Sequence, residues 1–122
     1  MDRWHLPSID VTGKREPRVL FSSPACRAVV IDLQADETMG DHQVHEYAMV
    51  QVVTGRVEIT AAGIEAECPA GSLVLFEPGE RHAVRAAEPS RILLLLAPWP
   101  GEGHYQPGEV EHLPANAQVP PS

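Results

Sequence analysis

The sequence is short of positive charge, and this scarcity limits the kinds of partner it can have. Over 122 residues, nine Lys and Arg stand against 17 Asp and Glu, which gives a formal net charge of -8 at pH 7. The arginines are scattered along the chain rather than clustered. Nucleic acids and anionic membranes are bound through clustered Lys and Arg. We therefore expect no nucleic-acid partner and no membrane partner, and interpret the acidity as serving solubility.

Cysteine pairs, long apolar runs and catalytic signature motifs are also lacking. The two cysteines, Cys26 and Cys68, lack the spacing of a metal-binding pair, and Cys68 falls on the apolar side of an alternating segment. The longest apolar stretch, residues 92–99, is far shorter than the roughly 20 residues of a membrane span. No secretory core, nucleophile elbow or phosphate-binding glycine loop is present. These absences lead us to expect a cytoplasmic protein.

Short strand-like segments separated by Gly and Pro turns fill most of the chain. A hydrophobic content of 43% supports a real core, and the length suggests one domain. Segments 48–55 and 56–63 look like a hairpin closed near Thr54 and Gly55. Many short strands at this spacing predict a sandwich or barrel. The expected strands are residues 18–22, 27–35, 48–55, 56–63, 64–68, 72–77, 81–86 and 91–97.

The two ends of the chain have a different composition from the middle. Residues 98–122 carry six of the twelve prolines, which predicts an extended tail. The stretch 1–17 is similarly irregular. We therefore expect a single domain over 1–122, with the barrel at about 18–97.

The segment 69–86 carries the most specific pattern. Gly71 precedes a strand, Pro78 and Gly79 form a turn after it, and His82 opens the next strand, where we expect it to point inward. This pattern resembles the second motif of the cupin superfamily. The resemblance covers roughly residues 19–97 and implies an all-β, double-stranded β-helix (jelly-roll) barrel.

The first cupin motif is only partly present. Gly40, His42 and Gly55 fit its first glycine, first histidine and closing glycine. Val44 stands at the position of the second histidine and Ala48 at that of the glutamate. The resemblance implies a metal held by three histidines and a glutamate, but of these ligands only the first histidine and His82 carry over.

Neighbouring residues offer replacements for the missing ligands. On one continuous strand, Glu46 would share the side of His42, which makes Glu46 the better third ligand beside His82. A bulge at the barrel rim would instead turn His45 inward, and His104 in the tail is a further donor. Two imidazoles and one carboxylate suit a divalent Fe, Mn, Zn or Ni ion.

Two functions follow from this interpretation. The first is a metal-dependent cupin that binds a small molecule in the barrel mouth, such as an oxygenase or isomerase. The alternative is a binding module that has lost its metal and keeps an apolar pocket. We also expect a homodimer, because paired barrel sheets and two-fold symmetry are common in soluble proteins. The alternative pocket would be lined by Val44, Ala48, Val50 and Val52.

Overall fold

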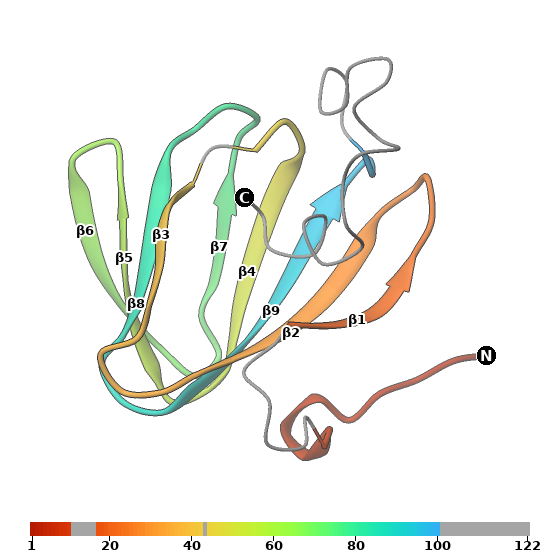
Figure 1. Cartoon of the computed structure of the whole chain (residues 1–122), viewed down its shortest axis with the longest axis horizontal. Coiled ribbons are helices and arrows are strands. Elements are labelled where there is room, and N and C mark those ends of the chain that lie inside the picture. The colour runs from red at the N-terminus through yellow and green to blue at the C-terminus, as the bar shows by residue number, and fades with distance from the viewer. Residues whose placement is uncertain (11–16, 43, 101–122) are drawn as a thin grey trace.

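The computed structural model describes residues 1–10, 17–42 and 44–100, and it is almost entirely β-structure (Figure 1). A short 3-10 helix, η1 (Leu6–Ser8), precedes the strands. No helix in this part of the chain is long and apolar enough to cross a membrane. The strands are β1 (Arg18–Ser22), β2 (Arg27–Leu33), β3 (Thr38–His42), β4 (Tyr47–Thr54), β5 (Arg56–Ala61), β6 (Ile64–Pro69), β7 (Leu73–Phe76), β8 (His82–Ala86) and β9 (Ser90–Ala97).

The strands form two antiparallel sheets, seen as two layers in Figure 1. The large sheet has five strands in the order β1-β2-β9-β4-β7, and the small sheet has four in the order β3-β8-β5-β6. Consecutive strands often belong to different sheets, as in a jelly roll. The expected all-β jelly-roll barrel is confirmed.

The core lies between the two sheets and follows the alternation of side chains along each strand. In β4, Ala48, Val50 and Val52 point into it and are fully buried. β2 and β9 are buried on both faces, because Leu6 and Ile9 of the N-terminal segment pack over the outside of the large sheet. A nearly continuous apolar run at 91–97 is the pattern expected of such a strand.

The expected hairpin over 48–63 is wrong. β4 pairs with β7 and β9, whereas β5 pairs with β6 and β8. The chain changes sheets at Gly55, whose φ of 81° favours glycine and where a Cβ would collide with Pro89 and Ser90. The backbone N–H of Arg56 donates to Ser90 Oγ at 3.0 Å, which ties the start of β5 to the start of β9. Alternation alone says nothing about which sheet a strand joins.

The true hairpin in this region joins β5 and β6. Its turn contains Ala62 and Gly63, both with positive φ. The sequence pattern also failed to indicate β3 as a strand of its own, because the stretch after Met39 resembles the irregular start of β4. β3 instead pairs with β8 in the small sheet.

Candidate functional site

Glu46 is a buried carboxylate in a row of inward-pointing side chains, at every second position of the segment 44–52, that is otherwise apolar. It precedes β4, and its side chain is 0% exposed. His45 and Tyr47, on either side of it, are exposed. A charge in an apolar interior costs free energy unless polar groups or an ion compensate it, so Glu46 is the most unusual residue of the core. The other members of its row are Val44, Ala48, Val50 and Val52, all buried.

His82, the first residue of β8, is another buried ionisable side chain, at 1% exposed. The ring of Phe76 stacks on its imidazole with centroids 4.0 Å apart and planes at 10°. Its Nδ1 lies 3.2 Å from the carbonyl oxygen of Glu80. A carbonyl oxygen only accepts hydrogen bonds, so Nδ1 carries the proton and donates. Nε2 then holds the lone pair that a metal ion or a ligand hydroxyl would use.

Backbone pairing brings the predicted ligands to one end of the barrel. His42, the last residue of β3, lies directly opposite His82 in the pairing of β3 with β8. The backbone N–H of Gly79 donates to the carbonyl oxygen of Val44 at 2.7 Å, which holds the segment before Glu46 against the turn before β8. The three sequence-predicted positions therefore meet at the same rim.

Contrary to the prediction, His42 and Glu46 do not lie on one continuous strand. β3 ends at His42 and β4 begins at Tyr47 in the other sheet. The alternation nevertheless holds from Val44 onward, so the carboxylate is buried and His45 points outward.

The complete ligand set falls partly outside the described residues. The side chain of His42 lies outside them, and so does His104. Among the side chains that the structure describes, no group of three or more His, Cys, Asp or Glu is arranged to hold a metal. In the same part of the chain, Oε1 of Glu46 and Nε2 of His82 are buried without a hydrogen bond, although both residues have interaction partners.

Trp99 adds an aromatic wall at this end, and the sequence pattern did not place it there. Ala97 pairs with Tyr47, so Trp99, two residues further on, lies at the end of the barrel where Glu46 is found. Trp99 is 7% exposed, belongs to the main core cluster, and packs under the Arg27 guanidinium, whose Cζ is 4.5 Å from its ring. Because Trp99 stands between two prolines, the sequence pattern assigns it to the Pro-rich tail. The one signal that it could be buried was its large aromatic side chain in an otherwise polar segment.

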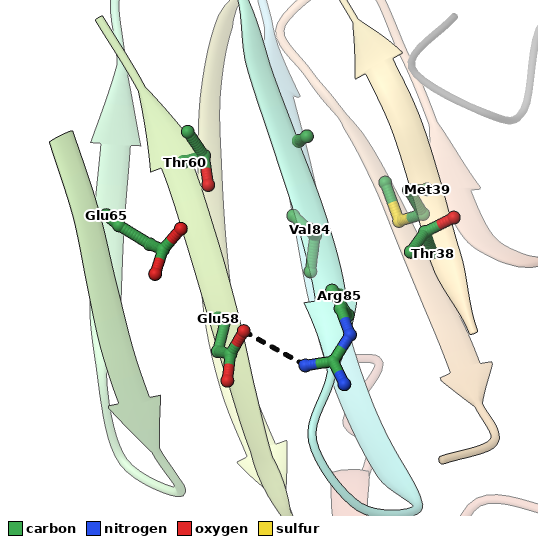
Figure 2. Close-up of a pocket in the computed structure, with 8 residues that line it drawn as sticks. Thr38, Met39, Glu58, Thr60, Glu65, Val84 and Arg85 are labelled. Atoms are coloured by element: carbon green, nitrogen blue, oxygen red, sulfur yellow. Dashed lines mark hydrogen bonds and ion pairs between the residues drawn. The ribbon is translucent and has the colours of Figure 1, made fainter. Parts of the chain in front are cut away.

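A separate hollow of about 310 Å³ lies on the outer face of the small sheet (Figure 2). Figure 2 shows Arg85 and Glu58 pointing toward each other from neighbouring strands, with Nη1 and Oε1 3.0 Å apart. Nη2 of Arg85 also lies 2.6 Å from Asp36. Because two carboxylates already neutralise this guanidinium, the hollow is a poor site for an anion.

A comparison with protein families identifies the chain. The model of the AraC-like ligand-binding domain matches residues 29–99, from β2 to the turn after β9. The chain belongs to this family. The AraC-like ligand-binding domain is of the cupin type, which agrees with the jelly roll and with the resemblance carried by His82 and the glycines around it.

Solved structures similar to this AraC-like domain have the same fold. A conserved protein of unknown function from Streptococcus pyogenes is 26% identical, with 66% of this chain and 71% of that chain covered and a TM-score of 0.62. KdgF from Halomonas sp. is 21% identical, with coverage of 67% and 76% and a TM-score of 0.63. An RmlC-like cupin from Desulfovibrio desulfuricans is 18% identical, with coverage of 80% and 97% and a TM-score of 0.71. No curated protein matches the chain.

Proposed function

We propose that this chain is a small metal-dependent cupin that binds a small organic molecule at the mouth of its barrel. A divalent Fe, Mn, Zn or Ni ion would be held by His42, Glu46 and His82. The observation that carries the proposal is the complete burial of Glu46 in an apolar row. A hydrophobic residue at this position would cost less to bury, so a carboxylate there fits a binding role better than a packing role.

The chemistry of the donors fits such an ion. Two neutral imidazoles and one carboxylate form a set that divalent first-row metals accept, and three protein ligands leave a position open for a ligand. His82 is already oriented for this role, because Phe76 fixes its ring plane and the Glu80 carbonyl fixes the proton on Nδ1. Such outer contacts commonly set the tautomer of a metal-binding histidine.

The rest of the mouth would position the organic molecule. When bound, the metal would supply a Lewis acid that polarises an oxygen of the substrate, which suits an oxygenase or an isomerase. Glu46 and His82 would fix where that oxygen lies. Trp99, which packs at the same end, would exclude water from the site.

A second candidate is a binding module that works without a metal. The family description, a ligand-binding domain, favours it. In this version Glu46 and His82 would form hydrogen bonds to the ligand directly. The apolar walls would be Val44, Ala48, Val50 and Val52, which in the described structure pack into the main core cluster.

We infer the cellular setting from composition alone. The net charge of -8 argues against nucleic-acid and membrane partners. We propose that the protein is cytoplasmic and that it acts on a small molecule as a homodimer.

Metal titration of the purified, chelator-treated protein tests the proposal. Calorimetry with Mn(II), Zn(II), Ni(II) and, without oxygen, Fe(II) should find one ion per chain for at least one metal. Glu46→Ala and His82→Ala should each lower the affinity by more than about tenfold, which is 1.4 kcal/mol. His45→Ala is the matched control, because its exposed side chain is adjacent in sequence, and it should leave affinity unchanged.

The opposite results have distinct meanings. A loss of affinity in His45→Ala but not in Glu46→Ala would assign the third ligand to His45. Wild-type protein that binds none of these metals near neutral pH would contradict the metal proposal and leave the metal-free binding module.

A further inference from the structure

Arg27, the first residue of β2, is a buried arginine on the inner face of the large sheet. It is 9% exposed, whereas Arg85 and Arg91 pair with carboxylates on the outer faces of the sheets. The strand register places Arg27 opposite Leu96 of β9, and Leu96 opposite Ala48 of β4. Leu96 and Ala48 belong to the main core cluster, and residues opposite each other share one face of a sheet. Arg27 therefore faces the interior of the barrel.

The row of side chains that starts at Arg27 leads across the sheet to the barrel mouth. Ala48 lies opposite Phe76 of β7, and the ring of Phe76 stacks on the imidazole of His82. Glu46 precedes Ala48 by two positions and lies at the same end of the barrel. Two strand spacings, about 10 Å, separate the backbone of Arg27 from that of Ala48. A small molecule anchored at Glu46 and His82 can therefore reach Arg27 with its far end.

The guanidinium of Arg27 is held in a fixed plane. Its Cζ lies 4.5 Å from the ring centroid of Trp99, and its Nε donates to Ser22 Oγ at 3.2 Å. The backbone N–H of Trp99 donates to the carbonyl oxygen of Pro24 at 3.3 Å, which holds the tryptophan against the turn between β1 and β2. A guanidinium held through its face and its Nε can bind an anion through the fork of Nη1 and Nη2. This planar fork matches the two oxygens of a carboxylate.

The charge of the chain makes such a cation necessary for an anionic ligand. The chain carries a net charge of -8, and Glu46 adds a carboxylate at the mouth itself. Both repel an anion unless a cation faces it. One guanidinium balances one carboxylate, whereas a phosphate group carries about two negative charges at pH 7. The apolar side chains between Arg27 and Phe76 suit a ligand with an apolar body.

We infer that Arg27 is the anion-binding residue of the mouth and that the molecule bound there is a small organic carboxylate. The inference rests on the proposed function in one respect, namely that the ligand lies beside Glu46 and His82. It does not depend on a bound metal, because the carboxylate is recognised by a side chain that is not among the proposed metal ligands.

Fluorescence titration of chelator-treated protein tests this inference, since without a metal the carboxylate cannot bind to an ion instead. The chain has two tryptophans, of which Trp4 stacks on Phe21, so Trp4→Phe leaves Trp99 as the reporter. The probes are benzoate, hexanoate, inorganic phosphate and benzamide, the neutral counterpart of benzoate. At least one of the two carboxylates should change the Trp99 emission with saturation. Benzamide should bind more than about tenfold more weakly than benzoate, because it lacks the charge that the guanidinium pairs with.

Substitution of Arg27 in the same background locates the binding site. Arg27→Gln should lower carboxylate affinity by more than about tenfold. Arg85→Gln is the matched control, because it removes one positive charge from the outer face of the small sheet, and it should leave affinity unchanged. Circular dichroism and urea unfolding check that the variants fold. Arg27→Lys, which keeps the charge and the aliphatic stem but loses the planar fork, should bind the carboxylate about threefold more weakly or worse, and it decides the matter if Arg27→Gln does not fold.

Metal titration separates this inference from the proposed function. Arg27→Gln should bind metal as the wild type does. A wild type that binds metal but neither carboxylate would leave the metal proposal intact and overturn this inference. A wild type that binds a carboxylate through Arg27 but no metal would support this inference and contradict the metal proposal. Carboxylate binding that survives substitution of Arg27, benzamide that binds as tightly as benzoate, or a preference for inorganic phosphate over both carboxylates would each overturn the inference.

Discussion

Asp32 and Glu46 both belong to the layer of the large sheet, but they lie on opposite sides of it. Asp32 points outward from β2 and accepts hydrogen bonds from Nε and Nη2 of Arg91 on the adjacent β9. Glu46 precedes β4 and points into the apolar interior. Both carboxylates lose contact with water, Glu46 completely and Asp32 in part.

The difference separates a carboxylate with a visible structural role from one that we propose to have a binding role. The Arg91 that pairs with Asp32 also donates to the carbonyl oxygens of Leu6 and Pro7, at 2.8 and 3.3 Å, so the pair fastens the N-terminal segment to the sheet. The structural role of the Asp32–Arg91 pair is therefore given directly by its hydrogen bonds. Glu46 occupies an apolar row at the barrel mouth, where its charge fits a bound ion or ligand rather than packing. Substitutions at the two sites should therefore act on different properties.

The largest loss of stability is expected from Arg91→Ala. It removes four hydrogen bonds and leaves Asp32 without its cation. Fully buried pairs cost more to break, but the Asp32 side chain is 37% exposed, so water reduces the loss to about 2 kcal/mol. Urea unfolding measures the loss, and faster amide exchange in residues 5–9 would show that the N-terminal segment is released. Arg85→Ala, which removes an exposed ion pair, is the control and should cost less than about 1 kcal/mol.

A stability change of the opposite sign is expected from Glu46→Leu. Replacing the Glu46 carboxylate by an apolar side chain removes the cost of burying a polar group among apolar neighbours, so stability should be unchanged or higher by up to about 1 kcal/mol. Metal or ligand affinity should fall at the same time. Urea unfolding of the chelator-treated protein measures the stability without a bound ion. A loss comparable to that of Arg91→Ala would instead make Glu46 a structural residue, like Asp32.

The features set by local sequence were predictable. Gly71, the Pro78–Gly79 turn and His82 are close in sequence and require particular backbone shapes, so their spacing alone indicates the fold. Alternation also identified the inward side of β4, including Glu46. Such signals depend only on neighbouring residues.

The features set by distant contacts were not predictable in the same way. Gly55 turns the chain into the other sheet because of Pro89 and Ser90, which lie more than thirty positions away. The pair of Asp32 and Arg91 spans 59 positions. Nothing local distinguishes a hairpin from a change of sheet, and so the 48–63 hairpin was mispredicted.

The smallest effect concerns Cys68, another ionisable side chain inside the barrel. Burial raises the pKa of its thiol above the ordinary value, so the folded state favours the neutral form. The thiol of the unfolded chain ionises first as pH rises above about 8.5. The contribution of Cys68 to the free energy of unfolding is therefore complete at neutral pH and is lost as pH rises through the folded-state pKa.

Cys68→Val should reduce this pH dependence. Both proteins compared should carry Cys26→Ser, so that Cys68 is the one thiol that distinguishes them. Urea unfolding at pH 7 and pH 10 should show a larger loss of stability for the protein that retains Cys68. Equal losses would mean that the burial of Cys68 does not penalise its thiolate. A larger loss would show that the interior excludes the Cys68 thiolate, in contrast to the charged Asp32, which the fold accommodates by pairing it with Arg91.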